Sequence, residues 1–190
     1  MRRAQRLRLQ NPYALSIPAV FLYGSTMDEP KAERPVFPKD YGVNDTPEGM
    51  LDWAYVNDQM SKALNYWISS VRPSGQPHAV PVWGVWLDNT FYFDGGPTTR
   101  HSRNIKANPN ISVHLESGDR VVILEGGCYL DPNLDDALLR SIADAYGVKY
   151  AEKGYKPEPS IWKGVGIFVL KLRSVIAWTN FLVDPTKWVF

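Results

Sequence analysis

The chain has 190 residues, of which 44% are hydrophobic and 22% are charged, and its formal net charge is +1. This length allows one domain with a sizeable core, and the balanced charge gives no basic field that would attract nucleic acid. A single cysteine excludes an internal disulfide framework and a cysteine-rich zinc site, whereas seven tryptophans are a heavy aromatic load for a chain of this size.

The first 49 residues are expected to be an N-terminal extension and linker. Four arginines within residues 1–8 precede a largely uncharged stretch, an order that resembles a secretory signal. Pro12 and Pro18 interrupt that stretch, and no run reaches the ~20 apolar residues of a membrane span. The sequence therefore favours a soluble, cytoplasmic protein that does not bind membranes. Residues 28–49, rich in Pro, Asp, Glu and Gly, predict an irregular linker.

From residue 50 the pattern is that of a folded domain. Residues 50–64 loosely fit one face of a helix, and residues 66–71 predict a strand. A Pro-Gly turn then leads into a long strand over residues 77–87. Asp88-Asn89 closes a hairpin, and residues 90–94 form the return strand.

The second half of the domain continues the hairpin pattern with two helices inserted. The glycines and proline of residues 95–97 mark a break, after which Thr98 or Thr99 is expected to cap a short helix. The remaining predicted elements are a helix ending near Asn108, strands over 111–116 and 120–126, a helix from Pro132 to Tyr146 followed by Gly147, and a strand over 165–178. This order predicts an α+β fold, mainly antiparallel β, with a barrel and helices at its margins.

Residues 98–104 (Thr-Thr-Arg-His-Ser-Arg-Asn) are the most informative segment for chemistry. Free N–H groups at a helix start, together with Arg100 and Arg103 on one helix face, make an anion site for which a phosphate is the natural ligand. A solvated basic helix face is the alternative interpretation.

Other candidate groups predict little chemistry. His78 and His114 are more typical of packed or structural histidines, and Cys128 is expected to be a buried thiol. No two histidines have metal-ligand spacing, and the glycine motifs of serine hydrolases and of dinucleotide-binding folds are absent. The sequence therefore assigns neither a catalytic residue nor a metal site.

The run from Tyr66 to Trp83 resembles the pyridoxamine 5′-phosphate oxidase-like superfamily, whose members are flavin- or deazaflavin-binding split β-barrels. Residues 99–105, 113–116 and 118–126 match the same pattern in order and spacing. The chain end, residues 186–190, is similar to the C-terminal Thr-Arg-Trp-x-Phe motif of one branch of this superfamily. The resemblance covers roughly residues 50–190 and implies a split-barrel flavin-binding domain there.

The resemblance also implies a homodimer with a cofactor site at each end of the interface, and a small-molecule substrate. Backbone groups of the strand from His78 would bond the cofactor ring, and the segment from Thr99 would bind its phosphate. The residues so placed are His78, Ala79, Val80, Pro81, Val82, Trp83, Phe93, Asp94, Thr99, Arg100, His101, Arg103, Asn104, Trp178, Lys187 and Trp188. The last three would come from the C-terminal end, across the interface.

The sequence departs from the true oxidase in ways that bear on function. The usual Arg-Lys pair at the phosphate is Arg100-His101 here, and the basic residues that recognise the oxidase's substrate are missing. We therefore expect an oxidoreductase that uses FMN, or alternatively the deazaflavin coenzyme F-420, on another small organic substrate. A non-enzymatic flavin- or haem-binding carrier or sensor is the alternative, followed by a split-barrel dimer that has lost its cofactor.

Overall fold

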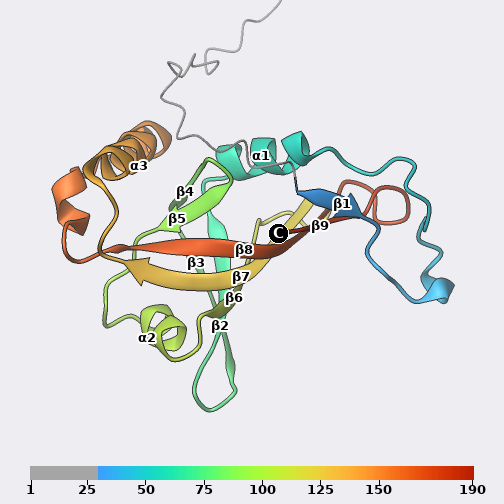
Figure 1. Cartoon of the computed structure of the whole chain (residues 1–190), viewed down its shortest axis with the longest axis horizontal. Helices are drawn as coiled ribbons and strands as arrows, with labels where there is room; N and C mark the ends of the chain where they lie inside the picture. The colour runs from blue at the N-terminus through green and yellow to red at the C-terminus, as the bar shows by residue number, and fades with distance from the viewer. Residues whose placement is uncertain (1–29) are drawn as a thin grey trace, which may run out of the picture.

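The computed structural model of the chain describes residues 30–190, and the expectations for the basic start and the uncharged stretch lie outside that range (Figure 1). The strands are β1 (Lys31–Glu33), β2 (Tyr66–Val71), β3 (Pro77–Val82), β4 (Gly84–Leu87), β5 (Thr90–Phe93), β6 (Asn110–His114), β7 (Val121–Asp131), β8 (Ile167–Trp178) and β9 (Thr186–Val189). The helices are α1 (Trp53–Lys62), α2 (Arg100–Ala107) and α3 (Asp136–Lys149), with short 3₁₀ turns at Lys39–Tyr41, Ala151–Lys153 and Pro159–Trp162.

All strand pairs are antiparallel, as the hairpin pattern predicted. Seven strands follow one another in the order β1-β9-β8-β7-β6-β2-β3, and the β4–β5 hairpin joins the sheet through β5, which pairs with β8. Figure 1 shows α1 above the strands and α2 below them, with α3 beside the β4–β5 hairpin. The predicted α+β split barrel with flanking helices is confirmed.

One row of side chains, read across the seven strands by their register, forms much of the main core. It runs Val80, Ile68, Val113, Leu124, Val175, Trp188 and Ala32. Alternate residues of a strand point to opposite faces, so this row belongs to the inner face. The adjacent residues point outward in a second row: Pro81, Trp67, His114, Ile123, Ile176, Lys187 and Glu33. None of the outward row is fully buried.

The long strand predicted over residues 77–87 is interrupted. β3 ends at Val82 and pairs with β2, whereas β4 begins at Gly84 and pairs with β5. The alternating pattern of the sequence runs through Trp83 without a break. The prediction therefore missed the change of pairing strand from β2 to β5. The break needs a glycine, because a Cβ at Gly84 would lie 2.8 Å from the Tyr92 carbonyl oxygen and closer still to the Phe91 ring.

Helix boundaries follow capping side chains. Thr99 caps α2, as expected, and its hydroxyl accepts a hydrogen bond from the Ser102 amide. The prediction that Pro132 begins α3 is wrong: Asp135 is the N-cap, and its carboxylate accepts from the Leu138 amide. The helix also continues past Gly147 to Lys149, because Tyr146 and Tyr150 anchor its last turn in a second core cluster.

The predicted linker contains an ordered segment. β1 pairs with β9, and the Arg34 guanidinium donates to the backbone carbonyls of Glu48, Val183 and Pro185. The distances to the Val183 and Pro185 oxygens are 3.0 and 2.8 Å. Arg34 therefore ties the residues before α1 to the turn before β9.

Candidate functional site

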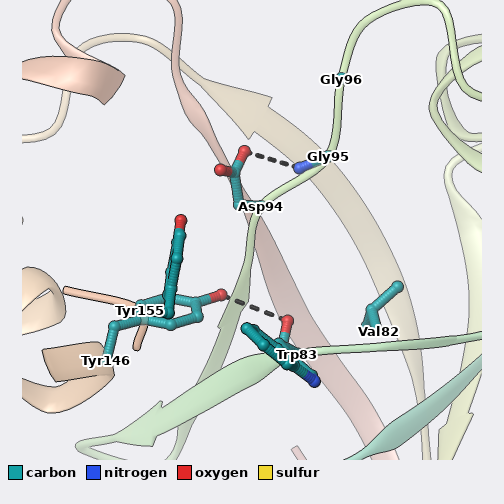
Figure 2. A pocket seen from close by; sticks show the side chains of 7 residues that line it. All are labelled: Val82, Trp83, Asp94, Gly95, Gly96, Tyr146 and Tyr155. Atoms are coloured by element: carbon teal, nitrogen blue, oxygen red, sulfur yellow. Dashed lines mark hydrogen bonds between the residues drawn. The ribbon is translucent and has the colours of Figure 1, made fainter. Parts of the chain in front are cut away.

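A pocket of about 300 Å³ opens where β3 ends and β5 leaves the sheet. Figure 2 shows the aromatic side chains on one side of it and the Gly95-Gly96 backbone on the other. The lining residues are Val82, Trp83, Asp94, Gly95, Gly96, Tyr146 and Tyr155. Three of them, Val82, Trp83 and Asp94, are positions that the sequence assigned to a cofactor, and Gly95 and Gly96 directly follow Asp94.

Three aromatic side chains form the wall of this pocket, supported from behind by Tyr150. Trp83 stacks on Tyr150 with ring centroids 4.7 Å apart, and Tyr155 meets Trp83 edge-on at 5.7 Å. The Tyr146 hydroxyl donates to the Trp83 carbonyl at 3.2 Å, and the Tyr150 hydroxyl accepts from the Gly84 amide at 2.8 Å. α3 thus holds the break between β3 and β4 in place.

The tyrosines of the wall are neutral hydroxyl groups at physiological pH. Burial raises the pKa of Tyr150 to about 12, and it raises the pKa of Tyr146 well above its ordinary value. Burial, followed by the negative charge of Asp94, raises the pKa of Tyr155. Asp94 is the only charged side chain among the lining residues, and one carboxylate oxygen accepts from the Gly95 amide at 2.6 Å.

A half-buried lysine lies behind the wall. The Lys149 ammonium donates to the Tyr66 hydroxyl at 2.6 Å and lies 5.0 Å from the centre of the Tyr66 ring. It forms no ion pair with a carboxylate of residues 30–190. Burial lowers the pKa of Lys149 to about 8, because the charged form loses its hydration there.

The start of α2 carries the groups on which the predicted anion site depends, and that site stays a prediction. The Thr99 and Ser102 hydroxyls lie 2.7 Å apart, and Ser102 donates to the Gly96 carbonyl at 2.9 Å, which fixes the loop against the helix. Arg100 and Arg103 are exposed, and their guanidinium groups bond to no side chain or backbone group of the described residues. Both arginines are therefore available to a ligand.

His101 does not share that exposure. Its ring is buried against Phe93 and Phe168, and Nε2 lies 3.2 Å from the Thr99 hydroxyl. Burial, and then the nearby His78, lower the pKa of His101, so the neutral ring is favoured. The structure thus argues against His101 as a phosphate-binding cation and makes it a support for the loop, where a Cβ on Gly95 would come within 2.5 Å of Nε2.

Polar groups lie beneath α2 on the inner face of the sheet. Asn104 is fully buried and donates to the Ser70 hydroxyl at 3.0 Å, and Ser70 pairs in register with His78. The Asn104 side-chain oxygen and His78 Nδ1 have no hydrogen-bond partner among the described residues. Asn104 therefore positions α2 and does not face the pocket.

β3 carries the other predicted cofactor residues, His78 to Val82, on a strand with one unpaired edge among residues 30–190. Pro77 and Pro81 have no N–H to give to β2, so their positions face that open edge, together with Ala79 between them. The open edge consequently offers three carbonyl oxygens and the Ala79 N–H. A ligand bound there must itself supply hydrogen-bond donors.

The remaining predicted residues do not meet this pocket within one chain. Phe93 is buried in the core, stacked on Phe168. Trp178 lies ten residues beyond Phe168 along β8, roughly 30 Å at the rise of a strand. Lys187 forms an ion pair with Glu33 at 2.8 Å, and Trp188 is a core residue only 1% exposed. Trp188 therefore presents no ring surface to a ligand in this chain, and its place among the cofactor residues stays a prediction.

Sequence reasoning missed the two tyrosines of the pocket, Tyr146 and Tyr155. The sequence of α3 predicts an apolar stripe through Leu134, Leu138, Ile142 and Ala145, whereas the buried residues are Leu139, Ile142, Ala143 and Tyr146. The i, i+4 pair Tyr146 and Tyr150 was the available signal, since two tyrosines on one helix face predict a buried face with hydroxyl partners.

Some classes of site find no support in residues 30–190. No cluster of three or more His, Cys, Asp or Glu side chains could hold a metal ion there. Within the same range, no helix is long and apolar enough to cross a membrane.

The fold is similar to several solved structures. A conserved hypothetical protein from Mycobacterium tuberculosis shares 21% identity, with 72% of this chain and 89% of that chain covered and a TM-score of 0.56. A haem-binding protein from Mycobacterium smegmatis shares 17% identity, covering 67% of this chain and 53% of that one, with a TM-score of 0.53. An FAD-binding protein from Mesorhizobium loti shares 17% identity, covering 72% and 93%, with a TM-score of 0.50.

No curated protein matches the sequence at a significant level. A sequence model described as pyridoxamine 5′-phosphate oxidase matches residues 56–178, which is more than half of the chain and includes the pocket's Trp83 and Asp94 and the arginines of α2. This match, together with the antiparallel split barrel, establishes that the protein belongs to the pyridoxamine 5′-phosphate oxidase-like family.

Proposed function

We propose that the protein is a flavin- or deazaflavin-dependent oxidoreductase, with FMN as the cofactor and coenzyme F-420 as the alternative. One observation carries the proposal: the loop from Asp94 to Arg100 joins an aromatic pocket to two arginines that have no partner among the described residues. A planar ring along the open edge of β3, beside the pocket, and a phosphate at the helix start suit the two ends of that loop.

The residues present fit such a cofactor. The open edge of β3 would accept the ring's N–H, and the Ala79 N–H would donate to a ring oxygen. Arg100 and Arg103 would form charge-assisted hydrogen bonds to phosphate, with Thr99 holding the loop. When bound, the flavin or deazaflavin supplies hydride transfer, and the protein supplies binding and orientation. Oxidation of pyridoxamine phosphate itself is not proposed, because Pro81-Val82-Trp83 and Thr186-Lys187-Trp188 replace the basic residues of the true oxidase.

We further propose a homodimer. The outward row of the sheet contains Trp67, Ile123 and Ile176, and all three side chains are partly exposed. Packing this face on a second copy would remove its apolar side chains from water. Trp178 lies on the same face, at the opposite end of β8 from the pocket, so it could approach only a partner's site.

A carrier or sensor that binds flavin without turnover is the second candidate. Its support is that the pocket and the start of α2 offer groups that would bind a flavin, whereas no catalytic residue is assigned in residues 30–190. A haem-binding carrier has less support, because no histidine, cysteine or methionine from the described part of the chain lines the pocket.

The deciding experiment is spectral. One portion of the purified protein is denatured, and the chromophore that it releases is identified. A second, folded portion is freed of cofactor and titrated with FMN and with coenzyme F-420. Saturable binding of either, followed by cofactor-dependent turnover of a reducible substrate, supports the oxidoreductase. Binding without turnover against a broad substrate panel supports the carrier, and failure to bind either cofactor defeats both.

A further inference from the structure

We propose that the pocket bounded by Trp83, Tyr146, Tyr155 and Asp94 is a subsite for a cationic organic group, so that the substrate of the proposed oxidoreductase carries a protonated or quaternary amine. The inference rests on the proposed function only in that the bound molecule is taken to be the substrate. The subsite itself is argued from the pocket's charge, geometry and size.

The charge of the lining has one sign. Among residues 30–190, Asp94 is the single charged residue of the lining, and no lysine, arginine or histidine of that range lines the pocket. One Asp94 oxygen is held by the Gly95 amide, and no described lysine or arginine forms an ion pair with the carboxylate. The carboxylate would repel an anionic group in the pocket, because no paired cation screens its charge. It would attract a cationic group.

The aromatic rings are arranged to surround a compact group. Tyr155 makes steep angles with both neighbours, 60° with Trp83 and 78° with Tyr146, and both centroid distances are 5.7 Å. Figure 2 shows the three rings meeting at one corner of the pocket, with Asp94 at its rim. Rings set at steep angles present electron-rich surface from different directions, which suits a cation.

The phenol hydroxyls do not counter this preference. The Tyr146 hydroxyl is engaged with the Trp83 carbonyl, and it stays protonated because burial keeps it neutral. Tyr150 covers one face of the Trp83 ring, and the residue is 38% exposed, so part of its surface is open to a ligand.

The volume limits the occupant. About 300 Å³ is at the low end of ligand pockets and holds a small group, not a whole cofactor with its phosphate tail. The open edge of β3 and the arginines of α2 therefore remain for the cofactor. The two ends of the site then have opposite charge preferences: a phosphate at Arg100 and Arg103, and an ammonium at Asp94.

The test uses three probes of one shape on the full-length protein: choline, its neutral isostere 3,3-dimethyl-1-butanol, and the anion 3,3-dimethylbutanoate. Binding is measured by calorimetry and by the NMR shift of the Trp83 indole signal. Choline is expected to bind about tenfold more tightly than the isostere, and the anion should not bind measurably. Equal affinity for choline and the isostere overturns the proposal, whatever the variants do.

Two variants locate the interaction. Asp94→Asn, which can still accept from the Gly95 amide, should weaken choline binding about threefold to tenfold and leave the isostere unchanged. Tyr155→Leu should weaken choline similarly, whereas Tyr155→Phe, which keeps the ring, should not. The matched control is Asp119→Asn, an exposed carboxylate in a turn elsewhere. Choline affinity that is the same in Asp94→Asn as in Asp119→Asn contradicts the assignment.

The same variants are titrated with FMN to separate the two proposals. Choline binding that depends on Asp94, in a protein that binds neither FMN nor coenzyme F-420, supports the cation subsite and defeats the proposed oxidoreductase. Cofactor binding without preference for choline over its isostere supports the oxidoreductase and overturns the subsite.

Discussion

Trp83 and Tyr150 stack with their planes only 13° apart, although one lies in the break between two strands and the other at the end of α3. This contact holds the ring of Trp83 at the pocket while leaving it partly exposed. Trp83 is therefore the tryptophan whose fluorescence should report a ligand. Trp178 is on the far part of β8, and Trp188 is sealed in the core.

Replacing Trp83 with Phe should remove most of the fluorescence quenching that accompanies FMN binding. Trp188→Phe should retain the quenching but lower the free energy of unfolding by roughly 2 kcal/mol, because it leaves a cavity beside Trp53. Fluorescence titrations with FMN and urea unfolding curves are measured for both variants. Quenching that survives in Trp83→Phe would place the cofactor elsewhere.

Arg100→Ala should weaken FMN binding by about 1.5–3 kcal/mol, the range for a hydrogen bond to a charged group. Lys106→Ala is the control, since Lys106 is an exposed cation in the last turn of the same helix. Equilibrium titration at fixed salt gives both dissociation constants. If both variants lose affinity equally, the arginine contributes only to a general positive field.

Lys149 should make stability depend on pH in the mildly alkaline range. Its pKa is about 8 in the folded chain and near 10.5 when unfolded, so the unfolded state binds more protons between these values. Its unfavourable contribution to stability therefore fades as pH rises through 8. Comparing the melting temperatures of the wild type and Lys149→Met at pH 7.5 and 9.0 isolates this contribution, because the tyrosines titrate in both. A difference that stays constant with pH would contradict the lowered pKa of Lys149.

Gly84→Ala should destabilise the fold by roughly 2–4 kcal/mol, because the added Cβ meets both the Phe91 ring and a strand carbonyl. Gly118→Ala is the matched substitution, since a Cβ there meets nothing within 4 Å. Chemical denaturation of the pair measures the difference. Similar free energies of unfolding in the two variants would contradict the prediction, because the β4–β5 hairpin would then accommodate the added Cβ by a small shift.

Ile176→Lys should produce a monomer if the outward row of the sheet is the dimer interface, because the substitution places a charge in the middle of that row. Ala151→Lys, at an exposed position in the turn after α3, adds the same charge away from this face. Light scattering after size exclusion gives the two masses. A dimer in both variants would move the interface to another surface.

The sequence predicted those elements whose cause is local. Thr99 could be recognised as a helix cap, and the strands from Tyr66 and from Ile111 have the alternation and turns that define hairpins. These features depend on neighbouring residues alone, and the same holds for the exposed arginines of α2.

Features set by distant partners could not be read in the same way. The break at Trp83 depends on Phe91 and Tyr92 across a hairpin, and the pocket depends on tyrosines more than fifty residues further along the chain. Strands β1 and β9 have three and four residues, too short for a periodic pattern. His101 looked like a cation beside two arginines, but the aromatic rings that bury it come from β5 and β8.

The pairing of β1 with β9, secured by Arg34, has a practical consequence for where the domain can be cut. A protein starting at residue 50 would keep every element of the pocket but leave the backbone groups of β9 without their neighbour. Unpaired strand edges recruit other chains, so such a protein would tend to self-associate through β9 and form aggregates. The short segment before α1 is thus a protective cover for the sheet.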